Sequence, residues 1–217
     1  MTLEAAVESV LAFVVVANLI LLGSSRLKSC IQIVALEGIA VGSLPILFEN
    51  FTLGARALLI SLVIIILKGV VFPHVLYRIL RDTDTHREVE PFVGYPLSLA
   101  IGVAALPFSI WVASRLELAT ETETTALAVA VGLATLLVGL FVIVSRKKAV
   151  NQVLGYIVME NGIYVFGVAL VGQVPMLVEL GVLLDAFVAV FIMSIAAYQI
   201  SREFEHIDVD QLDTLKG

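Results

Sequence analysis

The chain has 217 residues, of which 60% are hydrophobic and only 15% are charged, and its mean hydropathy is +1.05. Soluble domains contain about 45–50% apolar and about 25% charged residues, so this composition excludes an ordinary soluble domain and predicts a polytopic membrane protein. The single cysteine, Cys30, excludes an internal disulfide, and no cysteine or histidine spacing is typical of a metal or haem site. Nucleotide loops and nucleophile motifs are also missing, so we expect no catalytic residue and no cofactor on this chain. Its expected surroundings are a lipid bilayer and no nucleic acid.

Apolar runs of about 20 residues, the length that crosses a bilayer, occur seven times. The sequence therefore predicts an all-α protein with seven transmembrane helices. Basic residues at or beyond the ends of these helices divide ten to two between the two sides, which predicts an external N-terminus and a cytoplasmic C-terminus. The predicted helices are Ala5–Leu22, Cys30–Phe48, Leu58–Leu80, Leu97–Ala113, Thr125–Ser145, Ala149–Val171 and Met176–Ile200.

Two short motifs recur at nearly the same long period. SRLKSCIQ at 25–32 is matched 120 residues later by SRKKAVNQ at 145–152, and YRILRD at 77–82 is matched 121 residues later by YQISRE at 198–203. This pattern predicts two parallel three-helix repeats, 1–80 and 124–200, related by an axis along the membrane normal. Residues 81–123 would hold a cytoplasmic connection and a fourth helix that reverses the chain, and 201–217 a cytoplasmic tail. The alternative is that short basic turns look alike by chance.

Two acids stand deep inside the last two predicted helices. Glu160 and Asp185 are each about ten residues from a helix end, and a charged acid at that depth costs at least about 2.5–3.5 kcal/mol. Gln152, Tyr156 and Tyr164 share the spacing of four with Glu160, which predicts a polar ladder on one helix face. We interpret the acids as stations for protons; the alternative is neutral acids that hold helices together by hydrogen bonds.

The first repeat carries charges at comparable depth. Glu37 and Lys68 lie on consecutive helices, so they form either an ion pair, which could be purely structural, or two further stations of a relay. His74 follows Pro73, which should kink the helix or free a carbonyl, and could extend a wet path from Lys68. The favoured interpretation of His74 is an anchor at the membrane interface.

The second repeat resembles the small K-type, or 4L, membrane subunit of complex I. SRKK at 145–148 is similar to the basic turn of that family, Glu160 and Asp185 to its two buried acids, and HIDVDQLDTLKG at 206–217 to its ending. The sequence departs from the family in having Asp rather than Glu as the second acid, and about one extra turn before Glu160. The seven-helix length resembles component E of hydrogenase 4 in group 4 membrane-bound [NiFe] hydrogenases.

This resemblance implies a subunit of a redox-driven, ion-translocating complex that contributes buried carboxylates to a central proton path. The implied partners are antiporter-like membrane subunits, a quinone-chamber-type membrane subunit and a peripheral hydrogenase arm. The nickel–iron centre and the iron–sulfur clusters would belong to those partners. Three alternatives remain: a K-type subunit of a multisubunit cation/proton antiporter, a stand-alone small-solute transporter, and a passive membrane anchor.

Overall fold

The computed structural model describes residues 3–48, 55–82, 92–116 and 123–170, and this part of the chain is helical. Six of its helical stretches are long and apolar enough to cross a membrane. The predicted all-α, polytopic class is therefore confirmed, while the seventh predicted helix, Met176–Ile200, and the tail lie outside the described residues. The elements are α1 (Leu3–Gly23), α2 (Leu27–Phe48), α3 (Ala55–Ile66), η1 (Leu67–Val71), α4 (Phe72–Asp82), α5 (Tyr95–Arg115), α6 (Glu123–Ser145) and α7 (Ala149–Ala169).

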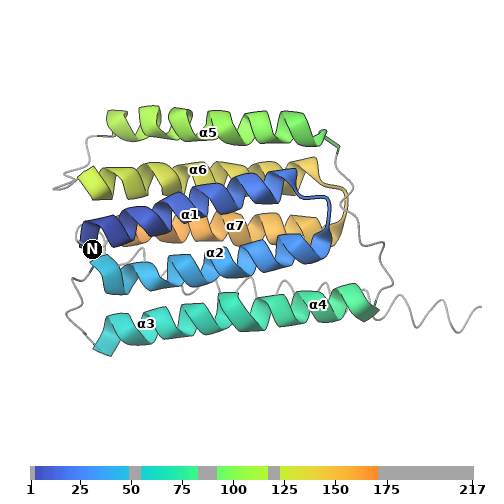
Figure 1. The fold of residues 1–217 in the computed structure, drawn as a ribbon, viewed down its shortest axis with the longest axis horizontal. Helices are drawn as coiled ribbons and strands as arrows, with labels where there is room; N and C mark the ends of the chain where they lie inside the picture. Colours follow the sequence, from blue (N-terminus) through green and yellow to red (C-terminus); the bar gives the residue numbers. More distant parts are fainter. Residues whose placement is uncertain (1–2, 49–54, 83–91, 117–122, 171–217) are drawn as a thin grey trace, which may run out of the picture.

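Four helices form the centre of the bundle. α1 packs on α2 and α6, while α7 packs on α2 and α6, so the four helices close a ring of contacts. α5 covers α1 and α6 on one side, and the continuous stretch α3–η1–α4 covers α2 on the other (Figure 1). The predicted repeat equates α1 with α6 and α2 with α7, the pairs that touch across this centre. The division into repeats stays a prediction, because the last helix of the second copy is outside the described residues.

Glycines bring α6 and α7 into backbone contact. Gly132 and Gly139 on α6 face Gly155 and Gly162 on α7, with a spacing of seven residues on each helix. A Cβ on Gly155 would lie 2.8 Å from the backbone nitrogen of Ile143 and 2.9 Å from the carbonyl oxygen of Gly139. Lipid tails are as apolar as leucine, so helices in a bilayer associate through close packing of this kind. The seam holds α7 firmly in place.

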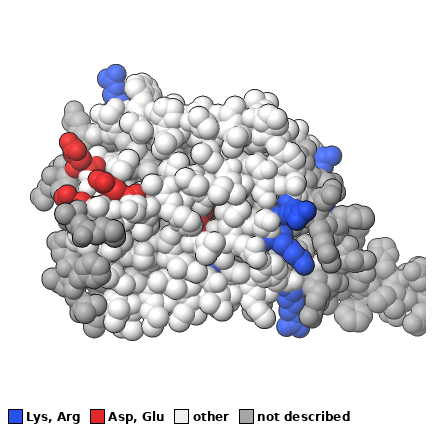
Figure 2. Space-filling view, in the orientation of Figure 1, with Lys and Arg blue, Asp and Glu red and all other residues white. Residues whose placement is uncertain are grey.

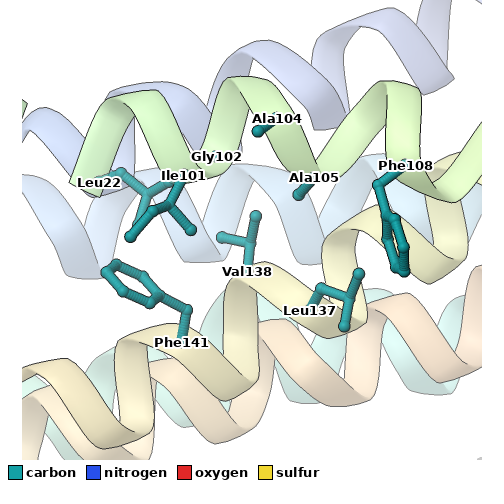
Figure 3. Close-up of a pocket in the computed structure, with 9 residues that line it drawn as sticks. All are labelled: Leu22, Ile101, Gly102, Ala104, Ala105, Phe108, Leu137, Val138 and Phe141. Atoms are coloured by element: carbon teal, nitrogen blue, oxygen red, sulfur yellow. The ribbon is translucent and has the colours of Figure 1, made fainter. Parts of the chain in front are cut away.

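By contrast, α5 lies at the edge of the bundle. Only 22% of the apolar stretch of α5 is buried inside the protein, against 67% of the corresponding stretch of α7. An open groove of about 400 Å³ separates it from α6, with Gly102 and Phe108 on one wall and Phe141 on the other (Figure 3). All nine residues that line this groove are apolar or glycine, so the groove offers no side chain for acid–base chemistry.

Charged side chains gather at the two ends of the bundle. Acidic residues lie near the N-terminal ends of α1 and α6, and basic residues gather at the opposite end (Figure 2). Arg115, which ends α5, is a basic residue on the acidic side. This separation agrees with the charge asymmetry of the sequence; which end faces the cytoplasm stays a prediction. The acidic end carries Glu4, Glu8 and Glu123, and the basic end carries Arg26, Lys28, Arg78, Arg146, Lys147 and Lys148.

Arg146 is buried at the basic end, where it contacts neighbouring helices. It is only 2% exposed, although it belongs to a turn of basic residues, and its Nη2 donates a hydrogen bond of 3.0 Å to the carbonyl oxygen of Leu22. That carbonyl is one of the last four of α1, which have no partner inside their own helix. The guanidinium also lies 5.3 Å from the ring centre of Tyr95, and its burial lowers the pKa of Arg146. One side chain thus ties α1, α5 and the α6–α7 turn together.

Candidate functional site

A widened helical turn places Lys68 in the middle of the third span. The α-helix gives way to the π-helix η1 over Leu67–Val71, where the N–H of Phe72 reaches the carbonyl of Leu67. Pro73 follows directly; it has no N–H, and its ring would press on the carbonyl four residues earlier in a regular α-helix. The prediction that Pro73 disturbs this helix is therefore realised as a π turn, a feature often found at functional sites.

Small residues let this turn approach α2 closely. A Cβ on Gly38 would lie 2.5 Å from the Cβ of Lys68, and one on Gly69 would lie 2.6 Å from Cγ1 of Ile39. The Lys68 side chain is consequently enclosed and only 1% exposed. Lysine at such depth needs partners, since an uncompensated charge in a bilayer is costly.

Partners for Lys68 come from α7. Its Nζ donates a hydrogen bond of 2.9 Å to Oδ1 of Asn161 and lies 3.8 Å from Oε2 of Glu160. The ammonium is also 5.6 Å from the ring centre of Tyr164, in a cation–π contact. Of the alternatives for Glu37 and Lys68, one was an ion pair between them; the ion pair observed joins Lys68 to Glu160. The third span is thereby connected to α7.

Glu37 completes the group from α2. It is fully buried, and neither of its carboxyl oxygens makes a hydrogen bond to any described residue. Its polar neighbours are the Asn161 amide and the Lys68 ammonium, which exert the electrostatic influence on it. The Nδ2 of Asn161 is likewise buried without a hydrogen-bond partner in the described part of the chain. The Asn161 amide and the Glu37 carboxyl therefore lie close together without a well-formed hydrogen bond between them. We call Glu37, Lys68, Glu160 and Asn161 the charge cluster.

The other predicted site residues occupy different surroundings. The ladder on α7 passes from the surface into the core: Gln152 is exposed, Tyr156 is half-buried, and Glu160 and Tyr164 are buried. Gln152 donates a weak hydrogen bond of 3.4 Å to the carbonyl of Arg146. His74 is exposed. Asp185 lies outside the described residues, and its role and those of the accessory residues stay predictions.

Asn161 is a cluster member that sequence reasoning missed. The signal was present, since Asn161 directly follows Glu160 within an apolar helix, but Asn161 does not share the spacing of four that defines the ladder. A second missed polar contact lies elsewhere: Nδ2 of Asn18 on α1 donates 3.0 Å to Oγ1 of Thr135 on α6. Both Asn18 and Thr135 are buried, so this pair holds two central helices together as a polar contact.

The position and composition of the charge cluster define its chemistry. Glu37, Lys68 and Glu160 each lie near the middle of a span, on three different helices. Carboxyl groups exchange protons, and a flexible ammonium can exchange partners, so the cluster is suited to proton handling. Within the described residues, no group of three histidine, cysteine or acidic side chains could hold a metal ion.

A multi-helix membrane protein with ionisable side chains enclosed at mid-height is the class that fold and site define. Residues 126–217 match the model of the family NADH-ubiquinone/plastoquinone oxidoreductase chain 4L. Hydrogenase-4 component E of Escherichia coli is 41% identical over 90 residues, which span 42% of each chain. These matches confirm the resemblance to chain 4L-type subunits and to component E.

A longer match covers nearly the whole chain. Uncharacterized protein Rv0085 of Mycobacterium tuberculosis is 29% identical over 204 residues, 93% of this chain and 92% of that protein. No solved structure matches the chain. The 4L-type match includes Glu160 and Asn161 but begins after Glu37 and Lys68, so half of the charge cluster comes from outside the matched segment.

Proposed function

We propose that this chain is a membrane subunit of a respiratory-type, redox-driven complex and contributes the charge cluster to a central proton path. The observation that carries the proposal is the meeting of three ionisable side chains at mid-membrane. Glu37, Lys68 and Glu160 come from three helices, are at most 1% exposed, and include an ion pair of 3.8 Å.

The burial of these three groups favours a role in proton transfer over a role in stabilising the fold. A buried ion pair is weak evidence for stability, because well-packed apolar residues of similar volume often serve equally well. Glycine seams already hold the central helices, so the fold has no need of three charges there. Carboxyl groups that accept and release a proton, with an ammonium that changes partners, provide the steps of a relay.

Partners and placement in the membrane complete the proposal. The complex would be of the hydrogenase-4 or complex I kind, with antiporter-like membrane subunits, a quinone-chamber-type subunit and a peripheral hydrogenase arm. Nickel–iron and iron–sulfur centres would reside in the arm. The similarity to hydrogenase-4 component E supports a prokaryotic inner membrane location, and the charge separation supports an external N-terminus with the basic end in the cytoplasm.

Amide substitutions in the intact complex test the relay. Glu160→Gln and Asp185→Asn keep volume and hydrogen-bonding capacity but remove a titratable proton. We expect the complex to assemble while donor-driven proton uptake into membrane vesicles falls at least tenfold, and Glu160→Asp to be milder because a carboxyl remains. Glu8→Gln, an exposed acid at the acidic end, is the matched control and should pump normally.

Two readouts separate the proposal from its alternatives. Assembly is followed as the amount of intact complex extracted, and transport as membrane potential or proton uptake. Full pumping by an assembled Glu160→Gln, Asp185→Asn variant would refute the relay and leave a structural subunit. Proton movement driven by a sodium gradient rather than by electron transfer would point to a cation/proton antiporter.

A further inference from the structure

We propose that Asn161 is a positioning residue that bridges Lys68 and Glu37, so that Glu37 and Glu160 share a single proton beside one ammonium. The inference rests on the proposed function, because it assigns the working states of the same charge cluster. It also makes a statement about the resting protein that can be measured without any transport.

Charge balance gives the first step. The cluster holds one cation, Lys68, and two carboxyl groups, Glu37 and Glu160; Tyr164 is a further titratable group in contact with Lys68. Two ionised carboxylates would leave a net negative charge at bilayer depth, which costs at least about 2.5–3.5 kcal/mol. One carboxylate and one carboxylic acid leave the cluster neutral. The neutral arrangement is favoured.

Geometry decides which acid holds the proton in this structure. Oε2 of Glu160 lies 3.8 Å from the Lys68 ammonium, so Glu160 is the ionised partner. Glu37 is equally buried but forms no ion pair with the described residues, so we assign it as the neutral acid. Its carboxyl still has Lys68 and Asn161 as polar neighbours.

The polarity of the Asn161 amide gives the third step. Lysine carries only donors, so the amide oxygen faces Lys68, at 2.9 Å. The oxygen and the NH₂ group are bonded to the same amide carbon, so the NH₂ group points away from Lys68. It is a donor without a hydrogen-bond partner among the described residues. Glu37 offers the unpartnered acceptors nearby. In the proposed bridge this NH₂ group donates to Glu37, and Asn161 then connects Lys68 to Glu37.

Two states of equal charge follow from this bridge. In one, Lys68 pairs with the Glu160 carboxylate and Glu37 carries the O–H bond. In the other, the O–H bond of Glu37 breaks, a proton is added to Glu160, and Lys68 pairs with Glu37. Each state contains one ammonium, one carboxylate and one carboxylic acid, so the exchange moves one proton without changing the net charge. Asn161 keeps the ammonium within reach of both acids.

Infrared spectroscopy of the full-length protein in lipid nanodiscs tests the shared proton. The carbonyl stretch of a protonated carboxylic acid is measured at neutral pH in an Asp185→Asn background, so that this third acid does not contribute. We expect one buried-acid band that disappears in Glu37→Gln and also in Glu160→Gln. In each variant the remaining acid pairs with Lys68 and is ionised. Two bands, each removed by one substitution, or no band at all, would overturn the shared proton.

The same band tests Asn161. Asn161→Leu removes the NH₂ donor, so the band should move to higher wavenumber, whereas Asn18→Leu, which removes the buried amide bonded to Thr135, should leave it in place. If Asn161→Leu does not accumulate, Asn161→Ala is measured with the same expected shift. An unmoved band would refute the bridge. Normal pumping by Glu160→Gln with the expected bands would refute the proposed function and leave the shared proton standing.

Discussion

Replacing Lys68 with methionine should expose how strongly the charge cluster depends on its one cation. Methionine matches the lysine stem in volume, so the change removes the charge with little change in packing. Glu160, 1% exposed and 3.8 Å from the ammonium in the unaltered protein, then has no cation from the third span. Loss of one partner of a buried pair costs about 3–5 kcal/mol.

The cost of protonating Glu160 in the Lys68→Met variant sets an independent limit on this loss. Adding a proton at pH 7 to a glutamate of ordinary pKa about 4.3 costs about 3.7 kcal/mol, at 1.36 kcal/mol per pH unit. Glu37 already carries its proton in the proposed resting state and adds nothing. We therefore expect a loss of about 3–4 kcal/mol at pH 7. Because protonation becomes easier as the pH falls, the loss should shrink by about 1.4 kcal/mol for each unit of acidification.

The assay is the free energy of unfolding of the full-length chain in mixed detergent micelles, measured at pH 7 and pH 6. Lys68→Met combined with Glu160→Gln and Lys68→Met combined with Glu37→Gln should each recover most of the loss, because each double variant has one cluster acid to protonate, as the unaltered protein has. Lys68→Met combined with Glu8→Gln, which changes an exposed acid, is the matched control and should recover little. Recovery by only one of the two cluster variants, or a loss that does not change with pH, would refute the shared proton.

Three further predictions concern the framework around the cluster. A Cβ on Gly155 would lie 2.8 and 2.9 Å from backbone atoms of α6, so Gly155→Ala should lower the free energy of unfolding by about 1–3 kcal/mol, whereas Gly23→Ala, with nothing within 4 Å, should not. Arg146→Gln should cost about 1.5–3 kcal/mol in the same assay through loss of a charged hydrogen bond, against less than about 0.5 kcal/mol for exposed Lys147→Gln. In a cysteine-free background, a cysteine replacing Glu123 should react with an impermeant maleimide in intact cells, and one replacing Lys147 only after permeabilisation; the reverse pattern would overturn the orientation.

Element positions were predictable from the sequence because hydropathy reports where the chain avoids water. The predicted helix Cys30–Phe48 corresponds to α2 at Leu27–Phe48, and Thr125–Ser145 corresponds to α6 at Glu123–Ser145. Pro73 predicted that the third span departs from a regular α-helix. It did not predict the form of that departure, since a kink, an open carbonyl and a π turn all relieve the same clash.

Partners across helices were beyond the sequence for a different reason. Hydropathy gives the depth of a residue, but all sides of these helices are apolar, so nothing in the pattern fixes which face meets which neighbour. Depth in the sequence singled out Glu37, Lys68 and Glu160, and all three are buried. The partnership of Lys68 with Glu160 and Asn161 depends on the rotation of α7 about its axis, which the glycine seam with α6 sets.

The boundary of the 4L-type match gives these contacts a consequence for the whole chain. The match begins at residue 126, so it contains Glu160 and Asn161 but not the cation that they contact. A segment limited to the match would contain Glu160 without the Lys68 ammonium that lies 3.8 Å from it here. In this chain the source of that ammonium is η1, which reaches α7 past the close approach to Gly38 on α2. The N-terminal half is therefore part of the site and not merely a flanking extension, because the electrostatic balance of Glu160 depends on it.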